Sequence, residues 1–168
     1  LDNTMAQLFW GRIKHMEKAA AWIYYIPQTK VDYLLFALKY HFHPEYGEYF
    51  GNLMANEMKN TGFFDGIDCI LPIPLTKERR RKRGYNQSEE LARGIARVTG
   101  LPVVTNAVER KSFDKSQTRL NRLQRMENVE KSFVCTHNRD IDLKGKHLLL
   151  VDDVVTTGAT ITACAQEL

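Results

Sequence analysis

The sequence predicts an α/β protein, with a parallel β-sheet flanked by helices and a small aromatic-rich α+β region at the N-terminus. Three observations predict this class. Residues 67–75 form a continuous apolar run, which is typical of a buried parallel strand, and residues 147–151 form a second one. An amphipathic segment with helix signals lies between them, from Asn86 to Gly100. Strands that alternate with helices favour a parallel sheet with right-handed crossovers.

Length and composition indicate an ordinary globular domain. The chain has 168 residues, of which 43% are hydrophobic and 26% charged, with a net charge of +4. No apolar run approaches the ~18 residues that a spanning helix needs, and the N-terminus has no secretory signal, so we expect no membrane span. The three cysteines are scattered and form no C-x-x-C pair, which favours a reducing, cytoplasmic compartment without disulfides or a zinc site. Because the chain does not begin with Met, we expect a fragment.

The first 62 residues are predicted to form a region of their own, rich in aromatic residues and methionine. Residues 19–26 have the composition of a short strand stopped by Pro27. A helix is predicted after Thr29, which can cap it together with Asp32. A second helix is predicted over residues 46–59, before Gly62.

Residues 63–168 are predicted to form the core domain. The strand that begins at Ile67 is ended by its prolines, and residues 76–87 follow as a basic loop. The helix after it is capped by Asn86 and stopped by Gly100. Short strands are predicted at 102–105 and 132–135, joined by polar segments to the apolar strand 147–151, and a last helix begins at about residue 159.

Positive charge is concentrated in two blocks. Residues 77–97 contain eight Lys and Arg against three acids, and residues 110–131 contain seven against three, whereas the rest of the chain is net acidic. Such blocks attract the phosphates of a nucleic acid or of a small ligand, but they are also compatible with a solvated surface. Residues 110–131 have few apolar residues, which is compatible with a mobile lid or with a surface helix over 119–130.

Residues 148–160 contain the most informative pattern. An apolar strand delivers Asp152 and Asp153 to its carboxyl end, where open α/β sheets bind their ligands. The next five positions open a helix with backbone N–H groups and hydroxyls that can surround a phosphate; they are Thr156, Thr157, Gly158, Ala159 and Thr160. A phosphate avoids carboxylates, whereas sugar hydroxyls donate hydrogen bonds to them, so a 5′-phosphorylated ribose fits both parts. The competing interpretation is that Asp153 only caps a helix and Asp152 lies on the surface.

The same stretch resembles the 5-phosphoribosyl-1-pyrophosphate (PRPP) motif of type I phosphoribosyltransferases. Two further segments, LPIPL at 71–75 and RGYNQ at 83–87, resemble the ComF family, which includes competence-associated DNA-uptake proteins. Residues 25–42 resemble the N-terminal region of that family. The resemblance also extends to a later set of residues: Gln117, Leu120, Arg122, Arg125, Asn128 and Phe133.

The chain departs from the ComF pattern at both ends. Members of that family often begin with a four-cysteine zinc ribbon, which is absent here. The family also continues past the helix in which this sequence stops, so we expect the core to be truncated at its C-terminus after Leu168.

The resemblance implies roles for individual residues. Asp152 and Asp153 would bind the ribose hydroxyls, residues 156–160 would hold the 5′-phosphate, and Arg83 with Gly84 would meet the pyrophosphate. Magnesium would bridge pyrophosphate and ribose oxygens. The implied activity is that of a glycosyltransferase-class enzyme of nucleoside metabolism, which transfers a 5-phosphoribosyl group to an unknown acceptor and releases pyrophosphate.

Two other functions remain open at this point. The domain could sense PRPP or a nucleotide without turnover, in contact with proteins of the competence machinery. Alternatively it could bind single-stranded DNA through its two basic blocks. Where hypoxanthine-guanine phosphoribosyltransferases have a carboxylate base, this sequence has Thr156, which disfavours purine substrates of that kind. His41 and His43 are interpreted as surface residues, and Cys69 as an inert core residue.

Overall fold

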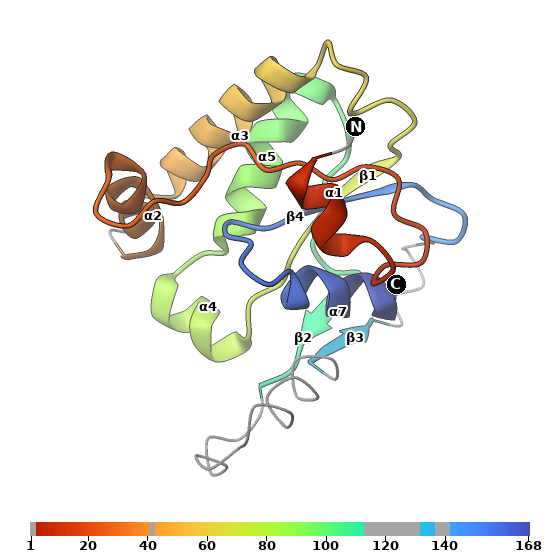
Figure 1. Cartoon of the computed structure of the whole chain (residues 1–168). Coiled ribbons are helices and arrows are strands. Elements are labelled where there is room, and N and C mark those ends of the chain that lie inside the picture. Colours follow the sequence, from red (N-terminus) through yellow and green to blue (C-terminus); the bar gives the residue numbers. More distant parts are fainter. Residues whose placement is uncertain (1–2, 41–42, 113–131, 137–141) are drawn as a thin grey trace.

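The fold was analysed in a computed structural model that describes residues 3–40, 43–112, 132–136 and 142–168. Figure 1 shows its elements in chain order: α1 (Thr4–Phe9), α2 (Lys30–Tyr40), α3 (Pro44–Met58), β1 (Cys69–Pro72), α4 (Lys77–Arg83), α5 (Gln87–Thr99), β2 (Val108–Arg110), β3 (Phe133–Cys135), β4 (Leu148–Val151) and α7 (Ala159–Glu167). The predicted α/β class with a parallel sheet is confirmed.

The central sheet is built from the two apolar runs of the sequence. β1 and β4 pair in parallel, with Cys69 opposite Leu148 and Pro72 opposite Val151. Residues 102–105 add one parallel bridge, between Ile70 and Val103, rather than the strand predicted there. β2 and β3 form a separate antiparallel pair, so the strand predicted at 132–135 exists but lies outside the parallel sheet. β2 itself was not predicted.

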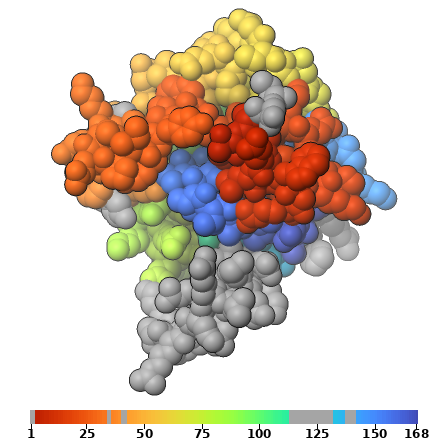
Figure 2. Space-filling model, in the orientation of Figure 1, coloured from red at the N-terminus to blue at the C-terminus, as the bar shows by residue number. Residues whose placement is uncertain are grey.

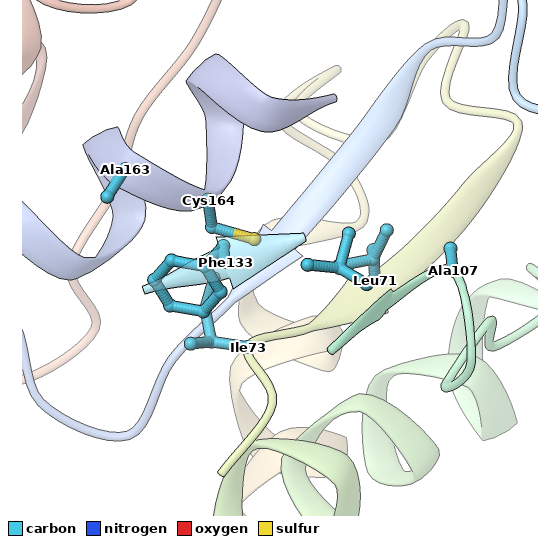
Figure 3. Packing of buried hydrophobic residues seen from close by; sticks show 7 residues of the cluster. Leu71, Ile73, Ala107, Phe133, Ala163 and Cys164 are labelled. Carbon is cyan, nitrogen blue, oxygen red and sulfur yellow. The ribbon is translucent and has the colours of Figure 1, made fainter. Parts of the chain in front are cut away.

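The two faces of this sheet have different helical covers. Ile70 and Val151 belong to a core cluster packed with α3 and α5, whereas Leu71 belongs to a cluster packed with α7, β2 and β3. Neighbouring residues of a strand point to opposite faces, which explains the alternation. Figure 3 shows Cys164 and Ala163 of α7 directed toward Phe133 in the second cluster. Both faces are therefore buried, as continuous apolar strands require.

α3 and α5 cross at unusually short range because glycines lie at the contact. A Cβ atom on Gly51 would come within 2.0 Å of the Leu91 carbonyl oxygen, and one on Gly94 within 2.0 Å of the Glu48 carbonyl oxygen. Figure 1 shows the two helices side by side. This crossing fixes the start of α5 relative to the sheet.

The caps of α5 match their prediction. The Asn86 side chain accepts a hydrogen bond from Ser88 N at 3.2 Å and donates one to the Ile73 carbonyl oxygen at 3.0 Å. Gly100 ends the helix at a φ of 73°. Because Ile73 follows β1, the cap also holds the first turn of α5 against the carboxyl end of the sheet.

Two further predictions about local structure are wrong. Residues 19–26 form no strand, and Tyr24 is 74% exposed, because no neighbouring strand offers a ladder to this segment. The basic segment that was predicted as a loop contains α4. Thr76 caps its N-terminus by accepting from Arg79 N, and Gly84 ends it at a φ of 79°. Every residue of α4 is at least partly exposed, so solvent and salt screen the repulsion among its basic side chains.

The N-terminal segment, residues 3–26, runs across the face at which β4 ends. In Figure 2 its red and orange atoms border and partly cover the blue atoms of β4, the following loop and α7. The boundary predicted at residue 62 stays a prediction. Within the described ranges, no helix has the length and apolar character needed to cross a membrane.

Candidate functional site

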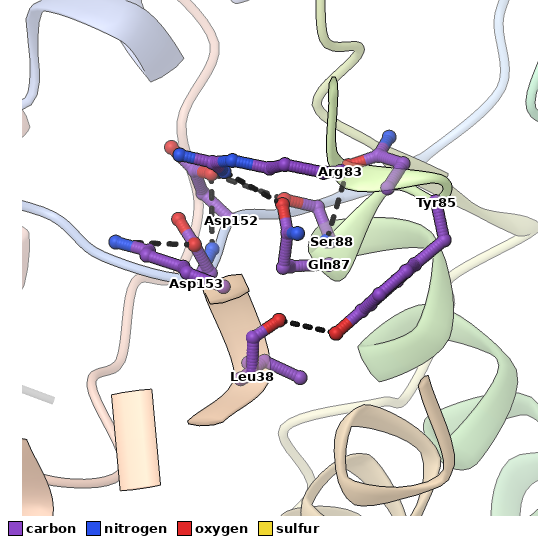
Figure 4. A network of polar contacts seen from close by, with 9 residues as sticks. Leu38, Arg83, Tyr85, Gln87, Ser88, Asp152 and Asp153 are labelled. Atoms are coloured by element: carbon purple, nitrogen blue, oxygen red, sulfur yellow. Dashed lines mark hydrogen bonds and ion pairs between the residues drawn. The ribbon is translucent and has the colours of Figure 1, made fainter. Parts of the chain in front are cut away.

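The two aspartates lie where the sequence predicts, directly after β4 and beside the end of β1. Ile73 N donates to the Val151 carbonyl oxygen at 2.9 Å, which keeps the ends of the two strands together. The start of α5 faces the same edge (Figure 4). Strand ends and helix starts thus converge at the carboxyl edge, where ligands of open α/β sheets bind.

Asp152 is a largely buried carboxyl group with two hydrogen-bond donors. Its Oδ1 accepts from the Ser88 hydroxyl at 3.1 Å and from Asp153 N at 2.9 Å. Burial raises the pKa of Asp152 to about 6, and the neighbouring charge of Asp153 adds to the rise. The two hydrogen bonds and the nearby Arg110 oppose the rise in pKa. A polar ligand that supplies further donors would favour the charged form of Asp152.

Asp153 faces α2 instead of α5. Its Oδ2 lies 3.3 Å from Lys39 Nζ, and the two side chains are 14% and 23% exposed. This contact is an ion pair rather than a hydrogen bond, because the same oxygen is enclosed and accepts no hydrogen bond from the described residues. A hydroxyl group of a ligand could supply the missing donor.

The loop after the aspartates leads into α7 with backbone N–H groups that are unpaired within the described ranges, although Gly158 itself is buried against Phe9. Thr156 and Thr157 are exposed, and Gly158 precedes the helix at a φ of 72°. Within the described part of the chain, no hydrogen bond occupies the N–H groups of Thr156, Thr157 and Gly158. Amides at the N-terminus of a helix that lack partners favour an anion, so the geometry is suited to a phosphate.

The N-terminal segment contacts the same loop. Arg12 Nη1 donates to the Thr157 carbonyl oxygen at 2.6 Å, and Gln166 Nε2 on α7 donates to the Arg12 carbonyl oxygen at 3.4 Å. Phe9 is buried against Gly158, where a Cβ atom would lie 2.6 Å from the Phe9 ring. Gly158 is therefore required both by its backbone angle and by this close approach.

Arg83 and Gly84 lie at the end of α4. Arg83 Nη1 donates to Gln87 Oε1 at 2.8 Å, and Figure 4 shows the Arg83 side chain extended across Gln87 and Ser88 in the direction of Asp152. Gly84 is the left-handed residue that ends α4, and it is exposed. The structure thus brings Arg83 toward the acids, whereas Gly84 serves the turn behind it.

Two more contacts connect α2 and β2 to this site. The Tyr85 hydroxyl donates to the Leu38 carbonyl oxygen, next to the ion pair of Lys39, and burial raises the pKa of Tyr85. Arg110 stacks over the Phe133 ring with 5.1 Å between its guanidinium carbon and the ring centroid. Burial lowers the pKa of Arg110, and the charge of Asp152 partly opposes this.

A cleft of about 2020 Å³ separates the N-terminal segment from the sheet edge. Asp152, Asp153, Thr156 and Arg12 are among the residues that line it. The volume exceeds what one small ligand fills, and much of the lining is apolar. The polar part at the aspartates is the part that can orient a ligand.

The donor set around the aspartates fits a magnesium ion brought by a phosphorylated ligand. No group of three or more His, Cys, Asp or Glu side chains is assembled for a metal among the residues that the structure describes. Magnesium is usually held by one or two carboxylates together with waters and substrate phosphates. Two adjacent carboxylates beside a loop with unpaired amides are compatible with that arrangement.

Sequence analysis missed three polar residues of this site: Lys39, Ser88 and Arg12. Ser88 has a local signal, because it follows the Asn86 cap at the buried start of α5. Lys39 and Arg12 have none, since each is more than a hundred positions from the residue that it contacts. The segment proposed as a lid lies mostly outside the described residues, from 113 to 131, as does His41. His43 stacks on Tyr46 and contacts Glu45, as expected of a surface residue.

Comparison with known proteins gives one family and several relatives. The family model described as "Phosphoribosyl transferase domain" matches residues 47–168. Competence protein F of Haemophilus influenzae is 30% identical over 109 residues, which cover 65% of this chain and 47% of that protein. DNA utilization protein YhgH of Escherichia coli K12 is 33% identical over 99 residues, which cover 59% of this chain and 42% of that protein.

A third relative is Competence protein ComFC of Bacillus subtilis. It is 33% identical over 97 residues, which cover 58% of this chain and 36% of that protein. In each case the match spans less than half of the relative's length. No solved structure matches the chain.

Proposed function

The chain belongs to the phosphoribosyl transferase domain family, as a ComF-type member, and we propose that it binds PRPP. We further propose that it transfers the 5-phosphoribosyl group of PRPP to an acceptor and releases pyrophosphate. The observation that supports this most strongly is the adjacency of two features at one sheet edge. The enclosed acid pair, Asp152 and Asp153, is followed by a loop in which the amides of Thr156, Thr157 and Gly158 have no hydrogen-bond partner among the described residues. A sugar diol and a terminal phosphate need that combination.

The roles of the residues follow from their charges. Asp152 and Asp153 accept hydrogen bonds from the ribose hydroxyls, and the amides of Thr157 and Gly158 hold the 5′-phosphate. As the bond to pyrophosphate breaks, the ribose carbon gains positive charge, which fixed carboxylates stabilise. Arg83 extends toward Asp152 (Figure 4), so its guanidinium supplies a cation for the departing anion. A magnesium ion bound together with the ligand would supply further positive charge next to the pyrophosphate.

Isothermal titration calorimetry with PRPP and Mg²⁺ tests the binding step. We expect wild type to bind, and Asp153→Asn to lose roughly tenfold or more in affinity, because charge-assisted hydrogen bonds contribute about 1.5–3 kcal/mol. Asp142→Asn, at an exposed turn, is the matched control and should bind as wild type does. Wild type that binds no PRPP, or Asp153→Asn that binds as tightly as wild type, would contradict the proposal.

Turnover separates an enzyme from a sensor. We expect pyrophosphate release with at least one acceptor in a panel of bases and amines, and its loss in the variant Asp152→Asn/Asp153→Asn. Binding without release across the panel would favour the sensing function. The acceptor remains to be identified, because no residue of the described cleft selects a nucleophile by its chemistry.

The names of the relatives, Competence protein F and DNA utilization protein YhgH, lead us to propose a role in the uptake or use of DNA. Direct binding of single-stranded DNA by the block 77–97 is less well supported. Arg80 and Arg93 pair with the buried Glu89, and Arg97 pairs with Glu48, so part of the block is neutralised locally. If DNA were the ligand of this block, a single-stranded oligonucleotide should bind with an affinity that falls steeply with salt.

A further inference from the structure

Gln87, the first residue of α5, lies between two side chains that hold the carboxyl edge of the sheet. On one side of it, Asn86 donates to the carbonyl oxygen of the residue after β1 at 3.0 Å. On the other side, Ser88 donates to Asp152 Oδ1 at 3.1 Å. All three side chains are buried, and that of Gln87 is only 1% exposed. The position of Gln87 is therefore fixed relative to the acids.

The Gln87 side chain directs its oxygen at Arg83. Arg83 Nη1, at the end of α4, donates to Gln87 Oε1 at 2.8 Å. In Figure 4 the Arg83 side chain passes Gln87 in the direction of Asp152. A hydrogen bond from a charged donor is stronger than one between neutral groups. Because an arginine side chain has many rotamers, this contact selects the one that is directed at the acids.

Gln87 offers Arg83 a neutral acceptor. A carboxylate at this position would form an ion pair with the guanidinium and weaken its attraction for a second anion. An amide oxygen orients the guanidinium and leaves its positive charge unchanged. A cation whose partner is an anion of the ligand needs this combination of fixed orientation and full charge.

The other end of the Gln87 amide has no comparable contact. Its Nε2 atom is buried and has no hydrogen-bond partner in the part of the chain that the structure describes. A buried donor without a partner costs free energy, so an apolar side chain of similar length would be more favourable here if packing alone mattered. The reversed amide would place its nitrogen against the donor of Arg83. The contact between Gln87 Oε1 and Arg83 thus accounts for both the polarity and the orientation of this side chain.

We propose that Gln87 is a positioning residue for Arg83, which directs the guanidinium toward the ligand at Asp152 and keeps its full charge available for the pyrophosphate of PRPP. This inference rests on the proposed function, in which Arg83 supplies a cation for the departing anion. It adds that the buried start of α5 determines how the pyrophosphate is bound.

A double-mutant cycle for PRPP affinity tests whether Gln87 acts through Arg83. By calorimetry with Mg²⁺, we expect Gln87→Met to bind PRPP about tenfold more weakly than wild type, and Arg83→Ala to lose as much or more. In the Arg83→Ala background, which is the matched control, Gln87→Met should change the affinity by less than about twofold. Arg83→Ala keeps the contacts proposed for the ribose and the 5′-phosphate, so binding stays measurable.

Gln87→Glu separates orientation from charge. The carboxylate keeps an oxygen that can hold Arg83 but pairs with its charge, so we expect PRPP to bind about tenfold more weakly here as well. Circular dichroism checks that the variants fold. If Gln87→Met does not fold, the same cycle is measured with Gln87→Glu.

The outcomes separate this proposal from the proposed function. If wild type binds PRPP and Gln87→Met binds it as tightly, the role of Gln87 is overturned and the proposed function stands. The role is also overturned if Gln87→Met weakens binding equally in both backgrounds, because a general loss of structure acts regardless of Arg83. Wild-type affinity in Gln87→Glu would overturn the requirement for a neutral partner. If wild type binds no PRPP, the proposed function fails and this inference fails with it.

Discussion

The buried carboxyl group of Asp152 lowers the free energy of unfolding at neutral pH. Its folded-state pKa of about 6 lies above the ordinary value of 3.8, so the folded protein holds a proton that the unfolded chain releases. The stability that this proton confers is complete below the ordinary pKa and is lost as pH rises through 6. By linkage, the shift makes the contribution of Asp152 to the free energy of unfolding about 3 kcal/mol smaller at neutral pH than below the ordinary pKa. A ligand that donates hydrogen bonds recovers part of that energy.

The variant Asp152→Asn tests this account at the residue scale. The amide keeps an oxygen that can accept from Ser88 and Asp153 N but has no charge to bury. We expect the variant to be more stable than wild type by about 1–3 kcal/mol at pH 7.5, with the difference shrinking toward pH 4. Urea unfolding across this range measures it. A variant that is less stable than wild type at pH 7.5 would show that burial does not dominate the energy of this carboxyl group.

At the scale of elements, α2 is held over the site by the Lys39–Asp153 ion pair. Its two side chains are mostly enclosed, so removal of one partner leaves a poorly solvated charge. We expect Lys39→Met to lower the free energy of unfolding by about 1–3 kcal/mol, and Asp153→Asn to recover much of that loss in the double variant. A double-mutant cycle from urea unfolding measures the coupling. Additive effects of the two changes would contradict a direct interaction.

The α3–α5 crossing gives a second prediction at this scale. Gly51→Ala places a methyl carbon only 2.0 Å from the Leu91 carbonyl oxygen, so the helices must move apart. We expect a loss of about 3 kcal/mol or more in the free energy of unfolding, because overpacking of a tight contact is costly. Tyr49→Ala on the same helix, at a residue that is 60% exposed, is the control and should cost less than about 1 kcal/mol. Equal losses in both variants would show that the crossing is not tightly packed.

Elements with local signals were predictable from the sequence. α5 has a capping asparagine and a terminal glycine that agree with its apolar spacing, and β4 is an apolar run bounded by polar residues. α4 has caps of the same kind, Thr76 and Gly84, so the segment predicted as a basic loop contains local helix signals. The strand predicted at 19–26 failed for a different reason, because composition cannot say whether a partner strand exists.

The site was predictable only in its local part. Asp152, Asp153 and the loop after them are consecutive in sequence, so their convergence follows from one strand and one helix start. Lys39 and Arg12 reach the site through the packing of α2 and α1 on the domain. Which lysine or arginine arrives there depends on tertiary contacts, such as Phe9 on Gly158, that have no periodic signature in the sequence.

At the scale of the whole molecule, three parts of the chain meet at one sheet edge. The strand β4 delivers the acids, the segment from α4 to α5 delivers Arg83 and Ser88, and the N-terminal region delivers Lys39 and Arg12. Both N-terminal cations precede the residues that the family model matches. The matched domain thus provides the acids and the loop after them, and the N-terminal region provides two cations, Lys39 and Arg12, that contact Asp153 and this loop.

We expect a ribose to lie on the aspartates while its 5′-phosphate lies in the amides that follow. Backbone amide NMR during titration with ribose 5-phosphate tests it most directly, because a hydrogen bond to phosphate shifts an N–H signal downfield. We predict the largest shifts at Thr157, Gly158 and Ala159, with smaller shifts at Asp152 and Asp153. Shifts that gather on α4 while these amides stay unchanged would contradict the claim.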